Sequence, residues 1–110
     1  MTVSFKGLGQ VAATFTCGAD VAAGQVVSIS ENGKVTAATA GSDVAGVCQN
    51  VRHGLATVIV AGHAQIPYTG EVSLGLASLV GEASGKAKAG EGGRQVLVVA
   101  SENGVLDAFL

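Results

Sequence analysis

Two histidines, His53 and His63, are the residues from which a catalytic site would have to be built, because a serine or cysteine nucleophile needs a base beside it. Neither lies in a Gly-x-Ser-x-Gly segment or beside a cysteine motif. His53 falls in a polar loop predicted over residues 50–54, where a solvated side chain is expected. His63 follows Gly62 at the start of a predicted strand, where a structural hydrogen bond is expected. We therefore expect no catalytic residue and no enzymatic activity.

The spacings that hold metal ions and cofactors are also missing from the sequence. Cys17 and Cys48 could meet the histidines in space, but no C-x-x-C or H-x-x-x-H spacing organises them, and the carboxylates are scattered singly. Residues 81–86, G-E-A-S-G-K, have the glycine and lysine of a phosphate-binding loop without its spacing. We expect no metal site and no cofactor.

The two cysteines could instead form a disulfide with each other. Residues 1–9 hold one lysine and no continuous apolar run of the length that an export signal needs. Cys17 and Cys48 are therefore expected to be reduced and buried. No apolar run approaches the length of a membrane span, so no membrane partner is expected either.

Residues 20–34 contain a pattern that returns later in the chain. Their sequence, D-V-A-A-G-Q-V-V-S-I-S-E-N-G-K, is matched at residues 71–86 by E-V-S-L-G-L-A-S-L-V-G-E-A-S-G-K, with one extra residue. Both copies have an acid, Val and Gly in register, then an apolar stretch, then Glu and Gly-Lys. Internal similarity in so short a chain predicts two related β units, each a tight turn, a strand, a hairpin turn and a return strand.

Alternating apolar residues and turn signals predict about ten short strands. Asn-Gly pairs at 32–33 and 103–104 suit hairpin turns, and Gly46 indicates a bulge or a close backbone approach. Residues 55–61 and 95–101 are apolar on both faces, which fits a strand central in a sandwich or one packed on a neighbouring subunit. A short helical turn is an alternative over residues 72–80. The expected fold class is all-β, a compact β-sandwich or partly open β-barrel of short strands.

Composition limits the kinds of partner. The chain has 110 residues, enough for one domain with its own core, and its net charge of −2 does not favour nucleic acid. Apolar residues make up 48% and charged residues only 13%. So few charges cannot cover the surface of a small domain, which leaves apolar surface of the kind that marks contact with another protein.

The N-terminal residues 1–9, M-T-V-S-F-K-G-L-G, have no clear period and are predicted to form an arm in front of a single β-domain at residues 10–110. A frayed terminus would explain this composition. An arm that docks on a partner through Phe5 explains it equally well, because Phe5 has no evident place on a free tail.

Taken together, several segments resemble the small bacteriophage capsid decoration proteins, also called head-stabilising or cement proteins. The resembling segments are D-V-A-A-G-Q-V-V-S-I, G-K-V-T-A-A-T-A-G-S-D-V-A-G-V, A-T-V-I-V-A-G-H-A-Q-I-P-Y, V-S-L-G-L-A-S-L-V and Q-V-L-V-V-A-S-E-N-G-V-L-D-A-F-L. The resemblance implies a homotrimeric structural virion protein that binds the major capsid protein on the outside of the shell, after assembly in the host cytoplasm, and stabilises the head. It implies capsid-binding residues in the arm, namely Thr2, Val3, Ser4, Phe5, Lys6 and Leu8.

Two other functions are considered beside this one. Residues 20–34 resemble biotinyl or lipoyl carrier domains, with Lys34 as the modified lysine, although carriers flank that lysine with Met or Asp and Ala rather than Gly and Val. A solvated lysine that begins a strand is the simpler interpretation. A sugar-binding module would need aromatic platforms, for which the sequence offers Tyr68, Phe5, Phe15 and Phe109.

Overall fold

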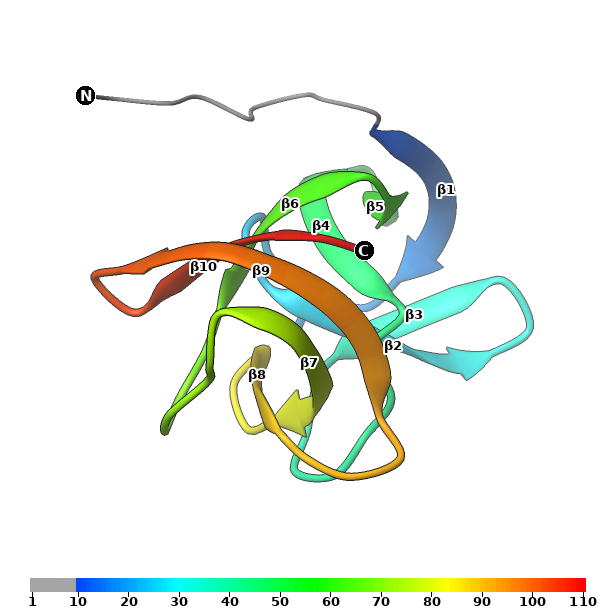
Figure 1. The fold of residues 1–110 in the computed structure, drawn as a ribbon. Coiled ribbons are helices and arrows are strands. Elements are labelled where there is room, and N and C mark those ends of the chain that lie inside the picture. The colour runs from blue at the N-terminus through cyan, green and yellow to red at the C-terminus, as the bar shows by residue number, and fades with distance from the viewer. Residues whose placement is uncertain (1–9) are drawn as a thin grey trace.

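The computed structural model describes residues 10–110, which form ten β-strands and no helix (Figure 1). No helix in this part of the chain could therefore cross a membrane. The strands are β1 (Val11–Cys17), β2 (Val26–Glu31), β3 (Lys34–Ala37), β4 (Gly46–Arg52), β5 (Leu55–Ala61), β6 (His63–Pro67), β7 (Gly75–Glu82), β8 (Lys86–Ala89), β9 (Arg94–Glu102) and β10 (Val105–Phe109). The all-β fold class predicted from the sequence is confirmed.

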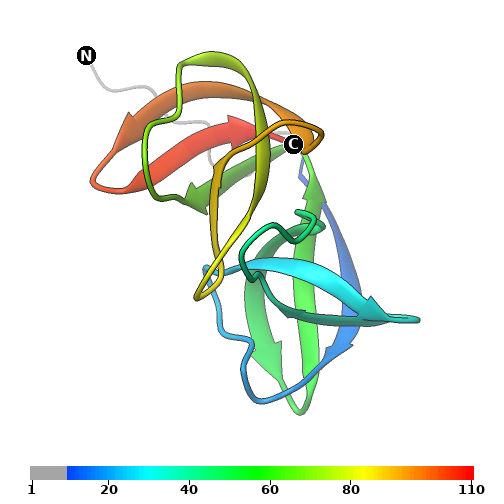
Figure 2. The same cartoon turned by 90° about the horizontal axis from the view of Figure 1, so that it is seen from below.

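The first five strands form a closed barrel with the order β1-β3-β2-β4-β5, in which β5 pairs with β1 again. Four of the barrel's strand pairs, β2–β3, β2–β4, β4–β5 and β1–β5, are antiparallel. The pairing of β1 with β3 is parallel, with Cys17 opposite Val35. The last five strands form a sheet with the order β6-β10-β9-β7-β8. Figure 2 shows these two five-stranded units side by side.

The second unit repeats the connectivity of the first, strand for strand. The hairpins β2–β3 and β4–β5 correspond to β7–β8 and β9–β10, and the pairing of β1 with β5 corresponds to that of β6 with β10. The parallel contact also recurs, because Tyr68 just beyond β6 forms a parallel bridge with Ala87 of β8. The internal repeat predicted for residues 20–34 and 71–86 therefore extends over both halves of the described chain.

The residue register of three strands repeats as well, whereas the register of β2 with β3 differs from that of β7 with β8. Val26, Val47 and Ile59 lie opposite one another across β2, β4 and β5, and Leu76, Leu97 and Phe109 do so across β7, β9 and β10. We call these sets the first row and the second row. Strands β4 and β9 each have a bulge just past the row, at Gln49 in β4 and at Val99 in β9.

The β4–β5 turn differs from the loop predicted over residues 50–54, and that prediction is wrong. Strand β4 continues to Arg52, and His53 and Gly54 alone make the turn, with φ of 52° and 75°. The corresponding turn, Asn103-Gly104, has φ of 55° and 78°. Two consecutive residues with positive φ match the twist of a two-residue hairpin, and histidine fills the position that asparagine usually takes.

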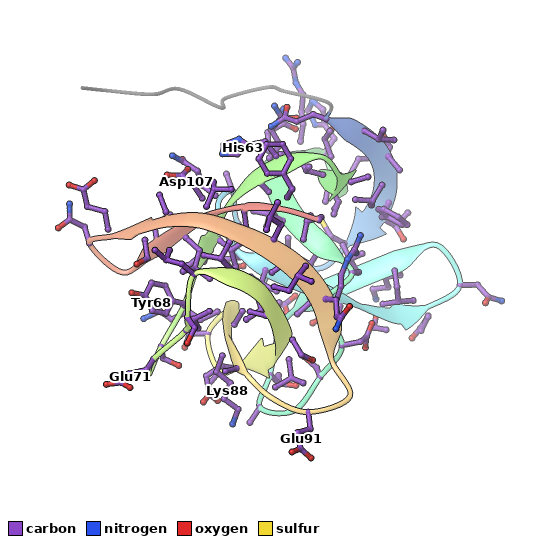
Figure 3. All side chains as sticks on the ribbon, in the orientation of Figure 1. His63, Tyr68, Glu71, Lys88, Glu91 and Asp107 are labelled. Atoms are coloured by element: carbon purple, nitrogen blue, oxygen red, sulfur yellow. The ribbon has the colours of Figure 1, made fainter. Side chains whose placement is uncertain are left out.

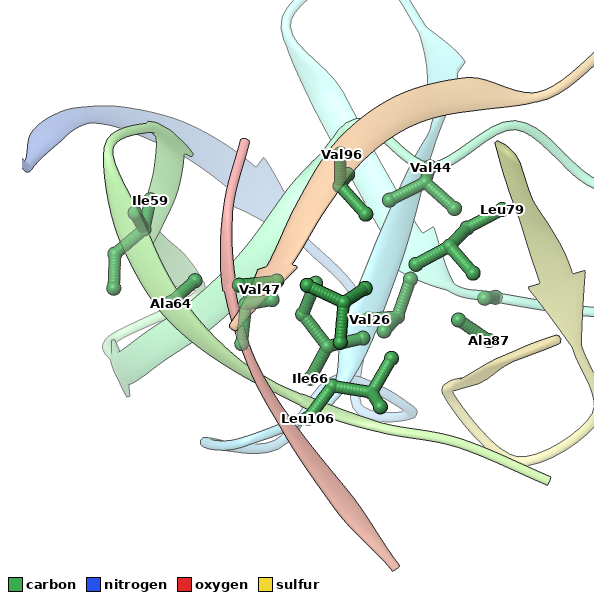
Figure 4. Packing of buried hydrophobic residues seen from close by; sticks show 13 residues of the cluster. Val26, Val44, Val47, Ile59, Ala64, Ile66, Leu79, Ala87, Val96 and Leu106 are labelled. Atoms are coloured by element: carbon green, nitrogen blue, oxygen red, sulfur yellow. The ribbon is translucent and has the colours of Figure 1, made fainter. Parts of the chain in front are cut away.

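The buried side chains form two clusters. The first lies inside the first barrel and consists of Val21, Val27, Val35, Cys48, Ala56 and Val58. The second, shown in Figure 4, combines the interior of the second unit with side chains of the first unit, including the whole first row. Strand β5 is apolar on both faces because it lies between the two clusters. Ala56 and Val58 belong to the first cluster and Ile59 to the second. Ala56, Val58 and Ile59 are thus covered on both faces of β5 within one chain, whereas Leu55 at the start of the strand is exposed.

Two further details settle predictions about the backbone. The helical turn considered over residues 72–80 is wrong, because β7 spans Gly75–Glu82 and pairs with both β8 and β9. Hydrogen bonding on two sides outweighs the helix preference of its Leu and Ala residues. The close approach predicted at Gly46 is confirmed, since a Cβ there would lie closer than 3.0 Å to the Ile59 carbonyl oxygen and to the Val58 side chain.

Candidate functional site

The capsid-binding residues predicted from the sequence, Thr2, Val3, Ser4, Phe5, Lys6 and Leu8, lie outside the described residues. The described chain begins at Gln10, just before β1. The Gln10 side-chain amide donates a hydrogen bond to the His63 carbonyl oxygen at 2.9 Å. This bond fixes the point where the N-terminal segment joins the body of the protein, beside the start of β6.

His63 is 3% exposed, and its Nε2 lies 3.2 Å from Asp107 Oδ1 on the neighbouring strand β10 (Figure 3). Its ring also contacts the Phe109 ring edge-on, with 5.6 Å between the centroids. The structural hydrogen bond predicted for His63 is therefore present. His53, by contrast, is exposed in its hairpin turn. The structure does not bring the two histidines together.

A pocket of about 210 Å³ opens beside His63, where the two units meet. Its wall combines side-chain amides with apolar groups and is formed by Gln10, Gly24, Val47, Cys48, Gln49, Ile59, His63 and Gln65. None of these lining residues has a carboxylate or a hydroxyl group, and the carboxylate that contacts His63 is that of Asp107. Within the described chain, no group of three or more histidine, cysteine or acidic residues is placed to hold a metal ion.

Neither cysteine forms a disulfide, and Cys48 is buried as expected, whereas Cys17 is only half-buried. The Cys48 thiol is 1% exposed and donates to the Asn50 carbonyl oxygen at 3.4 Å. Burial, with a further contribution from the nearby Cys17, raises the pKa of Cys48 above its ordinary value. A thiol kept protonated in this way packs as a small apolar group rather than acting as a nucleophile.

Lys34 does not occupy the tip of its hairpin. Asn32 and Gly33 form the turn, and Lys34 is the first residue of β3, between β1 on one side and β2 on the other. It lies opposite Glu31 of β2 and Thr16 of β1, and its side chain is half-buried. This placement fits a lysine that begins a strand.

Asp20 fixes the turn in front of β2 to the strand β3. Its carboxylate accepts hydrogen bonds from the Thr36 hydroxyl at 2.6 Å and from the Ala37 amide at 3.2 Å. These two bonds, that of Thr36 first, lower the pKa of Asp20 below its ordinary value of 3.8. The acid at the head of the first repeat thus has a structural role.

Apolar side chains are exposed on both units, as the low charge content predicted. Leu76 is 74% exposed, Leu74 64% and Leu97 44%, all on the outer side of the second unit. The first unit exposes Val11, Ile29, Val51 and Leu55. The sequence indicated that such a surface must exist, but single residues could not be assigned to it without the strand register.

No protein-family model matches the chain, and no curated protein matches it.

Proposed function

We propose that the chain is a structural virion protein that binds the outer surface of a bacteriophage capsid and stabilises the shell without performing a reaction. Its partners would be the major capsid protein and copies of itself, assembled as a homotrimer. The observation that carries the proposal is the set of seven large apolar side chains exposed on a body with only 13% charged residues. A surface of this kind favours lasting contact with other proteins.

The architecture supports a clamping role. A closed barrel and a five-stranded sheet share one apolar cluster, and a body held together in this way loses little conformational entropy when it binds. A trimer would engage several sites on the shell at once, so that weak contacts by each chain add up to stable attachment. The contact with the shell is assigned to the arm, with Phe5 as its apolar anchor, and the Gln10–His63 bond holds the base of the arm.

Co-sedimentation with purified capsids that lack decoration proteins tests the proposal. The intact chain is expected to pellet with the capsids and to raise the temperature at which they break open. A chain lacking residues 2–8 is expected to stay in the supernatant, and Phe5→Ala to bind at least tenfold more weakly. Lys6→Ala serves as the matched control in the same segment and is expected to retain most of the binding, because an exposed charge contributes little. Absence of binding by the intact chain, or equal binding by the truncated chain, would refute the proposal.

A further inference from the structure

Strand β6 stands at the end of the order of the second sheet, and within the described chain it pairs along its length with β10 alone. The Leu110 amide donates to the Gly62 carbonyl oxygen on the β10 side at 2.9 Å. Because peptide groups alternate along a strand, those of His63 and Gln65 point to the opposite side of β6. We call this side the free edge of β6.

The two ends of the free edge already have partners. At the start of β6, the Gln10 side-chain amide donates to the His63 carbonyl oxygen at 2.9 Å. Just beyond β6, the Thr69 amide donates to the Ala87 carbonyl oxygen of β8 at 2.9 Å. Between these two points, the Gln65 peptide group faces no strand of the described chain. An unpaired stretch of this kind is a template for the addition of a further strand.

The pocket beside His63 lies along the same edge. Gln10, His63 and Gln65 line one side of it, and Val47 and Ile59 of the first unit contribute apolar wall. Its volume of about 210 Å³ is sufficient for one large apolar side chain, since a cavity of about 150 Å³ holds a benzene molecule. A strand added at this edge would therefore have a recess for one of its side chains.

The arm of the same chain leads directly to this place. Strand β1 runs antiparallel to β5, with Val11 opposite Ala61, so the residues before Val11 continue in the direction of β6. The bond from Gln10 to His63 brings this continuation to the free edge. Residues 2–9 span up to about 26 Å when extended, which exceeds the roughly 17 Å of the five residues of β6. A segment tethered at this point also has an effective concentration on the order of millimolar.

The charges on both sides are compatible with this contact. Strands β6 and β10 carry one acidic side chain, that of Asp107, which lies opposite Gln65. Residues 2–9 carry one charge, that of Lys6, which has the opposite sign. The arm therefore brings no like charge to these two strands.

We infer that the arm adds to the free edge of β6 as an antiparallel strand and that Leu8 fills the pocket. Side chains alternate along a strand, so Leu8 lies on the same side as Gln10, whose side chain lines the pocket. Phe5 lies on the other side and stays available for the shell contact proposed above. The inference goes beyond the proposed function, because it concerns where the arm lies in the free protein, and it is tested without capsids.

Hydrogen exchange of single amides, followed by NMR in the intact chain and in a chain lacking residues 2–8, tests the position of the arm. The Gln65 amide is expected to exchange about tenfold or more slowly in the intact chain than in the truncated one. Leu8→Ser should accelerate its exchange about tenfold, and Phe5→Ser, the matched control, less than about threefold. The Val58 amide of β5, between β1 and β4, should stay equally slow in all four proteins, which verifies the fold.

The Thr14 amide distinguishes the other edge on which the arm could fold. The Thr16 amide bonds to the Gly33 carbonyl oxygen on the β3 side of β1, and β3 pairs with β1 only at Thr16 and Cys17. Thr14 therefore faces an open edge too. Its exchange is expected to be the same with and without the arm, and slowing of Thr14 in place of Gln65 would overturn the inference.

Four further results would also overturn it. They are fast exchange of Gln65 in the intact chain, equal protection in the truncated chain, equal acceleration by Phe5→Ser and Leu8→Ser, and protection at about 500 µM that is lost at about 50 µM, which would assign the arm to a neighbouring copy. If Gln65 is protected by the arm but the protein does not bind capsids, only the proposed function fails. If the protein binds capsids while Gln65 exchanges fast, only this inference fails.

Discussion

Replacing Val26 by alanine removes two methyl groups from a side chain that is 0% exposed and lies where the two units share a core. Each buried methyl group contributes about 0.8 kcal/mol through transfer from water. The cavity left behind adds to this cost, because the barrel strands on both sides hold the backbone in place. We therefore expect Val26→Ala to lower the free energy of unfolding by about 2–3 kcal/mol.

Leu76→Ala is the matched substitution, because Leu76 occupies the position in the second unit that Val26 occupies in the first. It removes more atoms than Val26→Ala, yet from a side chain that is 74% exposed. We expect a change in the free energy of unfolding of about 0.5 kcal/mol or less. Equilibrium unfolding in guanidinium chloride, followed by circular dichroism, measures both differences, provided that the slopes of the transitions agree.

The pair of substitutions also tests whether the two units unfold together. Val26 belongs to the first barrel but packs in the core of the second, so its loss should shift a single transition rather than split it. Equal costs for Val26→Ala and Leu76→Ala would refute the assignment of the two rows. Two separate transitions, with only one moved by Val26→Ala, would refute the shared core.

Three more substitutions or reagents test individual contacts. Asp20→Ala should lower the free energy of unfolding by about 1 kcal/mol at pH 7, because the carboxylate accepts two hydrogen bonds. Since the pKa of Asp20 is lowered from 3.8, this contribution is present above pH 3.8 and disappears as the pH falls through the lowered pKa. Urea unfolding at several pH values measures it. Gly46→Ala should cost about 2 kcal/mol or more, measured in the same way, because the added Cβ would overlap the Ile59 carbonyl oxygen. Iodoacetamide at pH 8 should modify Cys48 in the native protein on the order of 100-fold more slowly than in urea, because the thiol is buried and its pKa is raised; peptide mass spectrometry gives the rates.

Each of these tests has its own control. Asp43→Ala removes another acidic side chain close to the same barrel, and a loss of stability equal to that of Asp20→Ala would contradict the role given to the two hydrogen bonds. For Gly46→Ala the comparison is Ala45→Gly, which adds no atom to the same stretch. For the thiols, Cys48→Ala identifies which modified peptide belongs to Cys17. Rapid labelling of Cys48 in the native state would contradict its burial.

Much of the fold can be predicted from local sequence, because short strands and tight turns are decided locally. The alternation of apolar residues locates β1, and the Asn-Gly pairs locate two hairpins. The β4–β5 turn was missed because its positive-φ residues are His53 and Gly54 rather than asparagine and glycine. Strand β7 is ambiguous in sequence, because leucine and alanine suit a helix until pairing with two neighbours decides the matter.

The full extent of the repeat could not be predicted, because equivalent positions share a role but not a residue type. Cys17 and Tyr68 make the corresponding parallel contacts, and Val26 and Leu76 begin the corresponding rows. Only the strand register reveals these equivalences. The candidate surface was out of reach for the same reason, because the sequence indicates how much apolar surface must remain but not which strand faces solvent.

The structural repeat changes how the exposed leucines are interpreted. Single exposed apolar residues are ordinary on a protein surface and need no explanation. Leu76 and Leu97, however, lie opposite each other in the register that buries Val26 and Val47 in the other half. The first row is buried because interior side chains of the second unit, such as Ile66 and Leu106, pack on it. Within the described chain no such interior packs on the second row, and Leu76 and Leu97 therefore stay exposed.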